Sequence, residues 1–227
     1  ITEDQRARLC AHALRLARSA DYRSLGTFEF LVAAEPTEGE DVFFIKANPR
    51  IQVEHTVTKE IHGDDLVARQ LRIAGGETLA GMGLADGPRA PEGCAVQLRV
   101  NMERMDETAQ ALPAGGRVAV YEPPSGAGVR VDGFAYAGYR TSPHYDSLLA
   151  KVIVHARAGG WTAALARAER ALSEFRIEGV DTNLPWLRAL LARPEVAAAS
   201  VTTTFIEAEA KALFDAAAAF APAALPG

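Results

Sequence analysis

The stretch that decides the fold lies at residues 48–55, which read Asn48-Pro49-Arg50-Ile51-Gln52-Val53-Glu54-His55. Polar and apolar side chains alternate along it, which predicts an extended segment with Arg50, Gln52 and Glu54 on one side. Ile51 and Val53 are then free to anchor the other side. Arginine and glutamine donate hydrogen bonds to a small planar anion, whereas an ionised glutamate can only accept a proton. The pattern therefore predicts a site for a carboxylate-like anion, with a surface strand of ordinary polar character as the alternative.

The residues that precede this stretch predict a helix and two strands. Thr2 and Gln5 have the spacing of a capping box, and an apolar stripe with helical periodicity follows them. Aromatic and β-branched residues then predict strands on either side of a polar segment. The elements expected here are a helix to about Ala20, a strand over residues 27–32, a turn or hairpin loop over 35–41, and a buried strand over 42–45.

Beyond residue 55 the pattern changes twice. Asp64 is placed to cap a helix that carries an apolar stripe and ends at Gly75. A Gly- and Pro-rich stretch from Leu79 to Gly93 predicts a boundary near residue 85 between two α+β parts. The elements expected after it are strands over residues 96–100, 117–121, 128–131 and 148–155, a helix over 161–175, and another helix beginning near 183–185.

The composition of the 227 residues is that of an ordinary globular protein, with 48% hydrophobic residues. No apolar run approaches the roughly 20 residues that span a bilayer, so no membrane partner is expected. A net charge of −5 argues against a general nucleic-acid binder, which needs basic side chains to neutralise phosphates. Cys10 and Cys94 match no metal-binding spacing and are expected to be free thiols, with the cytoplasm as the default location.

In their order and spacing, these motifs resemble the biotin carboxylase family. This family is the ATP-dependent component of the acetyl-CoA, propionyl-CoA and pyruvate types of biotin-dependent carboxylase. The motifs that carry the resemblance are residues 26–31, 44–45, 48–58, 65–74, 98–101, 136–139, 145–147 and 179–183. The resemblance implies an α+β fold: the C-terminal part of an ATP-grasp domain over residues 1–84, then a biotin carboxylase C-terminal domain over 85–206. An Ala- and Pro-rich tail or linker is expected over 207–227.

The resemblance also implies a reaction and the residues that perform it. ATP phosphorylates bicarbonate to carboxyphosphate, which breaks down to phosphate and carbon dioxide, and N1 of a carrier-bound biotin is carboxylated. Arg50, Gln52 and the backbone of Val53 would hold the bicarbonate. Glu54 would be its general base, and Arg99 would stabilise the enolate oxygen of the biotin ureido group. Arg99 also fits an ordinary exposed position on an alternating strand.

The nucleotide side of the site contains one departure from the family pattern. Leu31 and Val180 would flank the adenine, although both would be core residues on any interpretation. Glu29 and Asn48 match positions that meet Mg²⁺ (or Mn²⁺) or the ATP phosphates, with simple solvent exposure as the alternative for Glu29. Lys46 stands where the family pattern has a metal-bridging glutamate. Because an ammonium cannot replace a carboxylate as a metal ligand, we expect productive Mg²⁺-ATP chemistry to be badly impaired.

The resemblance further implies partners that this chain does not include. They are the N-terminal half of a biotin carboxylase, a biotin carboxyl carrier domain and a carboxyltransferase, with a homodimer when the enzyme is complete. The chain taken alone is expected to be inactive, and its location would be the mitochondrial matrix in a eukaryote. Two alternatives remain: another ATP-grasp ligase that joins a carboxylate to an amine, and a non-catalytic module for dimerisation or for docking a biotin carrier.

Overall fold

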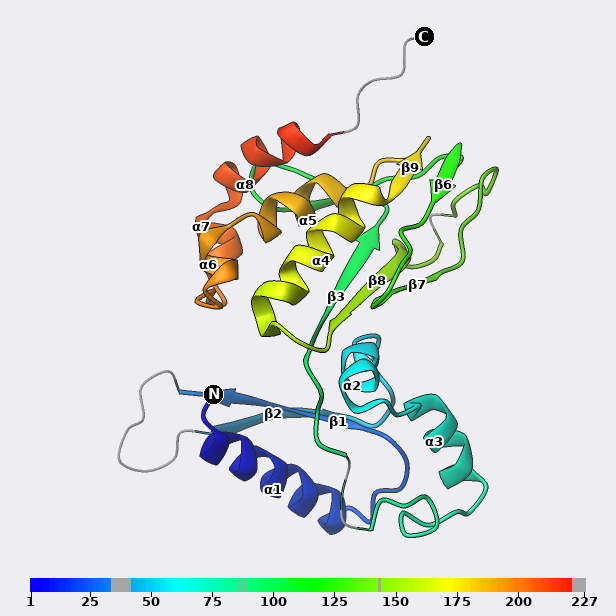
Figure 1. Ribbon diagram of the computed structural model, residues 1–227, viewed down its shortest axis with the longest axis vertical. Helices are drawn as coiled ribbons and strands as arrows, with labels where there is room; N and C mark the ends of the chain where they lie inside the picture. The colour runs from blue at the N-terminus through cyan, green and yellow to red at the C-terminus, as the bar shows by residue number, and fades with distance from the viewer. Residues whose placement is uncertain (34–41, 86, 88, 143, 222–227) are drawn as a thin grey trace. The chain divides into compact units, whose positions relative to one another are not determined.

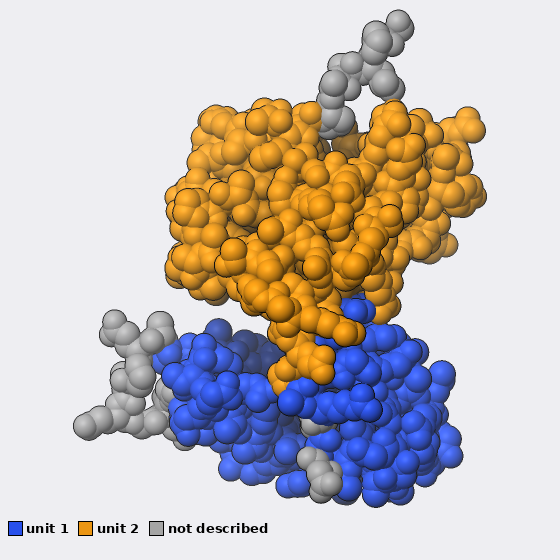
Figure 2. All heavy atoms as spheres, viewed as in Figure 1, with its two compact units in different colours: residues 1–90 blue, residues 91–227 orange. Residues whose placement is uncertain are grey.

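The chain divides into two compact units, residues 1–90 and 91–227 (Figure 2). This computed structural model describes residues 1–33, 42–85, 87, 89–142 and 144–221. The first unit consists of three helices and one pair of strands among its described residues. The second unit contains a three-stranded sheet, several short strands and a set of helices.

The first helix confirms the capping box read from the sequence. Helix α1 spans Glu3–Ser19, and the Thr2 side chain accepts a hydrogen bond from the backbone N–H of Gln5 at 3.2 Å. The Gln5 side chain accepts in return from the backbone N–H of Thr2 at 2.9 Å. Two backbone donors of the first turn are therefore paired reciprocally, which starts the helix at the predicted residue.

Strands β1 (Thr27–Val32) and β2 (Val42–Asn48) form an antiparallel pair that lies alongside α1 (Figure 1). The prediction of β1 is confirmed, and β2 runs three residues further than expected. The prediction that β2 is buried is wrong. Phe43, Phe44 and Ile45 are 52%, 50% and 50% exposed, and no third strand joins the pair among the described residues. The turn expected over residues 35–41 lies outside the described residues.

The extended segment predicted over residues 49–55 is wrong. The chain bends at Pro49 and Arg50, turns at Val53 and Glu54, and enters helix α2 (His55–His62). Local hydrogen bonds replace those of a strand: the N–H of Arg50 donates to the carbonyl of Asn48 at 2.8 Å, and that of His55 donates to Gln52 at 3.2 Å. Backbone groups that find partners within three residues have no need of a neighbouring strand.

Helix α3 (Leu66–Ala74) begins one residue later than predicted. Asp65, not Asp64, is the N-cap, and its carboxylate accepts from the N–H groups of Val67 and Ala68 at 3.1 and 3.2 Å. Asp64 instead pairs with Arg69 at 2.8 Å. The predicted end of the helix at Gly75 is confirmed.

The second unit is organised by an antiparallel sheet of order β3-β8-β7. Its strands are β3 (Cys94–Asn101), β8 (Leu148–Ala156) and β7 (Val129–Gly133), and helix α4 (Gly160–Glu174) covers one face (Figure 1). Val100, Leu149 and Leu172 are almost fully buried between helix and sheet. All four elements were expected from the sequence, as was helix α5 (Leu184–Leu191).

Short strands complete the second unit. They are β4 (Glu103–Met105), β5 (Ala111–Pro113), β6 (Val120–Glu122) and β9 (Arg176–Glu178). The strand predicted over residues 117–121 is therefore only partly present. Its first residue, Arg117, makes an isolated bridge to Arg140, and β6 starts at Val120.

Residues 207–221 differ from the tail or linker expected over 207–227, and the rest of that range lies outside the described residues. The end of helix α7 (Phe205–Ala208), helix α8 (Ala210–Ala217) and a 3₁₀ turn η1 (Ala218–Phe220) lie in this region, and helix α6 (Pro194–Ala197) precedes it. Leu213 is completely buried in a cluster with Trp186. Alanine has the highest helix propensity, so an Ala-rich stretch with one well-placed leucine folds as a packed helix. Among the described residues, none of the helices has the length and apolar character needed to cross a bilayer.

The burial of Leu213 leads to a stability prediction. Leu213→Ala should lower the free energy of unfolding by about 2–4 kcal/mol, because it leaves a cavity against Trp186. Urea denaturation followed by tryptophan fluorescence measures the change. Ala216→Ser, at an exposed position of the same helix, should change it by less than about 0.5 kcal/mol. Equal, small effects of both variants would show that α8 is not packed in solution.

Candidate functional site

Strand pairing places the predicted metal-site residues of the first unit together. Glu29 lies directly opposite Lys46, and a bulge follows because Phe30 pairs with Phe44. The Glu29 carboxylate accepts a hydrogen bond from the Asn48 side-chain amide at 2.7 Å and a weaker one from the Gln52 amide at 3.3 Å, both on Oε1. Its other oxygen, Oε2, lies 3.6 Å from the Lys46 ammonium. Three donors, two from β2 and one from the following bend, thus surround one carboxylate of β1.

This environment changes the acidity of Glu29. Partial burial raises the pKa of the carboxyl group, but hydrogen bonds from Gln52 and Asn48 and the charge of Lys46 outweigh it. The net result is a pKa below the ordinary value for glutamate. Glu29 is therefore an ionised acceptor near neutral pH, fixed in place by its neighbours.

The residues around Glu29 do not fit a divalent cation. Magnesium is held through one or two carboxylates with open oxygen lone pairs. Here Glu29 presents one oxygen to two amide donors and the other to the Lys46 ammonium. Nowhere in the described part of the chain do three His, Cys, Asp or Glu side chains gather closely enough to hold a metal ion. The departure seen at Lys46 in the sequence is thus matched in the structure by a carboxylate whose two oxygens already face donors of this chain.

The predicted bicarbonate residues lie on a bend and a helix start, not on one side of a strand. The Arg50 side chain is exposed, and its guanidinium donates to the carbonyl of Ile51 at 3.2 Å. Gln52 is half-buried and points its amide at Glu29, and Val53 is also half-buried. Glu54 is exposed at the N-cap of α2. The structure therefore joins Gln52 to the Glu29 group and leaves Arg50 and Glu54 at the surface.

The two residues predicted to flank adenine belong to different units. Leu31, on β1 of the first unit, is 57% exposed, so the expectation that it is a core residue is wrong. Val180, in the second unit, is half-buried and packs against the core cluster around β3 and α4. An exposed leucine on a strand is available to an apolar ligand, whereas Val180 already has a structural function.

Arg99 lies on β3 opposite Lys151. Its guanidinium is 3.8 Å from the carboxylate of Asp146, a motif residue for which the sequence predicts no function. Asp146 also accepts from the N–H of Leu148 at 2.8 Å, which fixes the turn before β8. Asp146 is thus the second charged group beside Arg99, and only its spacing in the Tyr145-Asp146-Ser147 motif could have indicated it.

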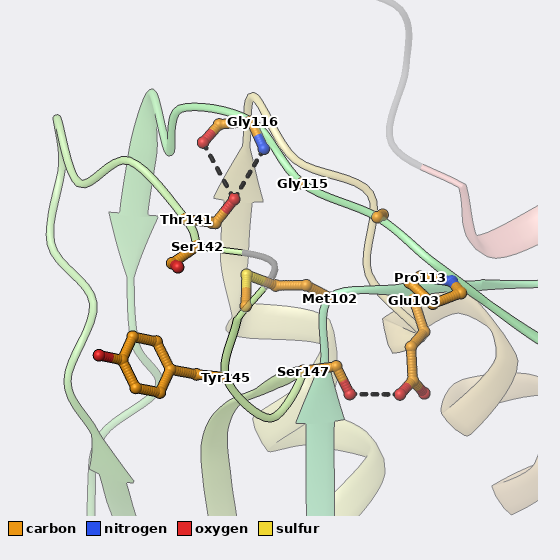
Figure 3. Close-up of a pocket in the computed structure, with 10 residues that line it drawn as sticks. Met102, Glu103, Pro113, Gly115, Gly116, Thr141, Ser142, Tyr145 and Ser147 are labelled. Carbon is orange, nitrogen blue, oxygen red and sulfur yellow. Dashed lines mark hydrogen bonds between the residues drawn. The ribbon is translucent and has the colours of Figure 1, made fainter.

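A pocket of about 510 Å³ opens in the second unit beside this turn (Figure 3). Ser147 donates a hydrogen bond to Glu103 on one wall, and on another Thr141 accepts from the N–H of Gly116 at 2.8 Å. The Tyr145 ring points away from the Glu103–Ser147 pair (Figure 3). None of the side chains predicted to be functional lines the pocket. The hydrogen bond from Ser147 to Glu103 instead helps to hold the turn that carries Asp146.

Comparison with known proteins identifies the family. The family model of the carbamoyl-phosphate synthase L chain ATP-binding domain matches residues 1–82, and that of the biotin carboxylase C-terminal domain matches residues 97–208. The chain belongs to the biotin carboxylase family. The expected fold is thereby confirmed: the C-terminal part of an ATP-grasp domain followed by the biotin carboxylase C-terminal domain.

Solved structures agree with this assignment. The biotin carboxylase domain of a single-chain bacterial carboxylase is 48% identical with a TM-score of 0.86, over 97% of this chain and 49% of that chain. A single-chain long-chain acyl-CoA carboxylase is 45% identical with a TM-score of 0.87, over 100% of this chain and 24% of that chain. A third structure is the biotin carboxylase domain dimer of Hydrogenobacter thermophilus 2-oxoglutarate carboxylase, solved with MgADP and bicarbonate. It is 34% identical with a TM-score of 0.83, over 95% of this chain and 45% of that chain.

Curated relatives include pyruvate carboxylases. That of Aspergillus niger is 43% identical over 205 residues, which is 90% of this chain and 16% of that protein. The mitochondrial pyruvate carboxylase of Mus musculus is 40% identical over 203 residues, covering 89% of this chain and 17% of that protein. The chain therefore spans about one sixth of the length of these relatives.

The environment of Glu29 leads to a titration prediction. Lys46→Gln should raise the pKa of Glu29 toward the ordinary value, because it removes a cation 3.6 Å away. Carbon-13 NMR of the side-chain carboxyl group follows the titration. Since the folded-state pKa is lowered, the carboxylate stabilises the fold above its unfolded-state pKa, and this contribution is lost as pH falls through the folded value. Lys59→Gln, which removes the partner of Asp65, should leave Glu29 unchanged. An unchanged pKa of Glu29 in Lys46→Gln would contradict the ion pair between Lys46 and Glu29.

Proposed function

We propose that this chain is part of a biotin carboxylase that uses ATP and bicarbonate to carboxylate biotin on a carrier domain, through carboxyphosphate. The observation that carries the proposal is the bend over residues 49–54, which places Arg50, Gln52 and Glu54 on one short segment directly before α2. The relatives support it, because they are biotin-dependent carboxylases and solved biotin carboxylase domains. The match over residues 97–208 favours it over another ATP-grasp ligase.

In this proposal the anion is bound at the bend before α2. Arg50 would hold bicarbonate through two parallel N–H donors, and Gln52 and the backbone of Val53 would add further donors. The exposed Arg50 head has the freedom to turn toward such an anion. Helix α2 starts at this bend, and the partial positive charge of its N-terminus favours an anion beside it.

Glu54 would take the proton of bicarbonate. A general base must reach the proton and be ionised, and it need not be a nucleophile. Glu54 is exposed at the N-cap of α2, four residues from Arg50, so base and anion-binding side chain arise from one short segment. The deprotonated bicarbonate would attack the terminal phosphorus of ATP, and ADP would leave with the electron pair of the broken P–O bond.

Arg99 would act on biotin. Transfer of the N1 proton to the phosphate released from carboxyphosphate would place negative charge on the ureido oxygen, and a guanidinium beside that oxygen stabilises the charge as it develops. Arg99 has an acidic neighbour, Asp146, whose carboxylate lies 3.8 Å from the guanidinium. Leu31 and Val180 would contact the adenine of ATP. The location proposed is the cytoplasm, or the mitochondrial matrix if the protein is eukaryotic, like its Mus musculus relative.

The proposal includes partners beyond this chain. Phe43, Phe44 and Ile45 on β2 are each at least 50% exposed, which supports the coverage of this strand by further protein. We assign this cover to the N-terminal half of a biotin carboxylase. A biotin carrier and a carboxyltransferase would complete the reaction, and a homodimer is the proposed assembly, as in the 2-oxoglutarate carboxylase domain. The isolated chain would be inactive.

A second candidate is a non-catalytic module for dimerisation or for docking a biotin carrier. The specific observation in its favour is the Lys46–Glu29 pair, which occupies the carboxylate expected to serve Mg²⁺-ATP chemistry. The two candidates differ in one measurable property, which is turnover by the full-length protein.

The first test of the function concerns Glu54. Glu54→Gln in the full-length protein should lower biotin-dependent ATP hydrolysis, assayed with bicarbonate and Mg²⁺, by about a hundredfold or more, because a neutral amide cannot accept the proton. Glu60→Gln, further along the same helix, is the matched control and should change the rate less than about twofold. Equal rates for wild type and Glu54→Gln would exclude Glu54 as the base.

The second test concerns Lys46. Lys46→Glu in the full-length protein should raise biotin-dependent ATP hydrolysis by about tenfold or more, because it restores a second carboxylate beside Glu29. Lys46→Gln, which removes the charge without adding an oxygen anion, separates metal ligation from simple loss of the ion pair. Equal turnover by the wild type and by Lys46→Glu would contradict the impaired metal site. No turnover by any form would favour the non-catalytic module.

A further inference from the structure

Strand β3 carries Arg99 at the edge of its sheet. Among the described strands it pairs with β8 only, and its ladder is irregular between Val100 and Asn101. The backbone groups on the outer edge of such a strand need other partners. At Arg99 and Asn101 those partners come from one residue, Asn183, which is 84 positions from Arg99 in sequence.

Asn183 binds the strand edge on both sides of Val100. Its side-chain amide donates to the carbonyl of Arg99 at 3.1 Å, and its side-chain oxygen accepts from the N–H of Asn101 at 2.9 Å. Its own backbone N–H donates to the carbonyl of Asn101 at 3.1 Å. These three hydrogen bonds reproduce what a neighbouring strand would supply, and they are placed at the residue proposed to act on biotin.

The side chain makes these contacts in place of its common local one. Asn183 is the N-cap of α5, a position where asparagine is favoured because its oxygen accepts from the first helical turn. No such capping hydrogen bond is present here. Asn183 is only 9% exposed, so both ends of its amide must be paired inside the protein. They are paired with β3.

The same loop carries Val180, proposed to contact adenine. Gly179 starts this loop with φ +88°, and a Cβ there would lie 2.2 Å from the carbonyl oxygen of Arg117. Any other residue would push the loop away, so its path is fixed by packing at one end. Asn183 fixes it at the other end. Three residues after Val180, the chain is thus tied to the backbone of Arg99.

The ion pair of Arg99 does not provide equivalent positioning. Its distance to Asp146 is 3.8 Å, and both side chains are substantially exposed. Exposed pairs of this kind hold a flexible side chain weakly. The starting point of the Arg99 side chain is therefore set mainly by the hydrogen bonds on its backbone.

We propose that Asn183 is a positioning residue for Arg99, which holds β3 through the Arg99 carbonyl and the Asn101 N–H and ties it to the loop that carries Val180. This rests on the proposed function, in which Arg99 stabilises charge on biotin. Misplacing a catalytic group by about 1 Å can cost about a hundredfold in rate, so a clamp at its backbone has a kinetic consequence.

Asn183→Asp separates the two side-chain contacts. The aspartate keeps an oxygen for the Asn101 N–H and can still begin α5, but its second oxygen faces the Arg99 carbonyl, acceptor against acceptor. Thr182→Val is the matched control, because it alters only a long contact with the N–H of Leu184 at 3.4 Å. Asn183→Ala removes both side-chain contacts. Urea denaturation of every variant reports whether the second unit remains folded.

The first measurement uses the 227-residue chain and needs no activity. The Nε–Hε resonance of Arg99, assigned with Arg99→Lys, should shift and exchange faster with solvent in Asn183→Asp and remain unchanged in Thr182→Val. An Arg99 resonance that is the same in Asn183→Asp and wild type overturns the proposal.

The second measurement is biotin-dependent ATP hydrolysis by the full-length protein. The parent is the wild type if it hydrolyses ATP, and otherwise the Lys46→Glu variant. Asn183→Asp should lower kcat by about tenfold to a hundredfold, with the KM for ATP within about twofold, and Thr182→Val should match the parent. Unchanged turnover in Asn183→Asp, where Arg99→Gln is inactive, overturns the kinetic function of the clamp. If Arg99→Gln itself turns over normally, the proposed function of Arg99 fails, and the resonance alone decides whether Asn183 positions it.

Discussion

The antiparallel pairing of β1 with β2 decides which side chains of the first unit can meet. Its register sets Glu29 opposite Lys46 and Thr27 opposite Asn48. A shift of one residue would turn each of these side chains to the other face of the pair. Because the chain bends directly after β2, Gln52 returns to the same carboxylate. One register therefore assembles an ammonium, two amides and a carboxylate from residues that are up to 23 positions apart in the sequence.

The second unit depends on a comparable constraint at an edge. Strand β3 packs its alternate residues, Leu98 and Val100, into the core, which directs Arg99 outward. The carbonyl of Arg99 then needs a partner beyond the sheet, and Asn183 supplies it. A residue that looks like an ordinary helix cap in the sequence is in this way part of the sheet. Buried amides are costly unless fully paired, so the three hydrogen bonds are mutually required.

The sequence predicted those elements whose signals are local. The capping box at Thr2, the aromatic strand over residues 27–32 and the end of α3 at Gly75 each depend on a few neighbouring residues. The bend over residues 49–55 could not be predicted in this way, because alternation suits a strand only where another strand is present to pair with it. The departure from the family pattern at Lys46 was visible in the sequence. The hydrogen bonds and the ion pair that surround Glu29, however, depend on the register of β1 and β2. Likewise, Asp64 and Asp65 are equally good candidates for the N-cap in the sequence. In the structure Arg69 pairs with Asp64, and Asp65 is the residue that caps α3.

The exposed apolar side chains of β2 have a consequence for the solubility of the chain. Phe43, Phe44 and Ile45 lie at consecutive positions of a strand, and the described residues leave both outer edges of its two-stranded pair without a neighbour. Edges with apolar side chains readily pair with other copies of themselves, which is the route from a folded protein to an aggregate. The molecule relies on a net charge of −5 to keep copies apart, and salt screens that repulsion. Concentrated solutions at high salt are therefore the conditions in which this chain would first aggregate.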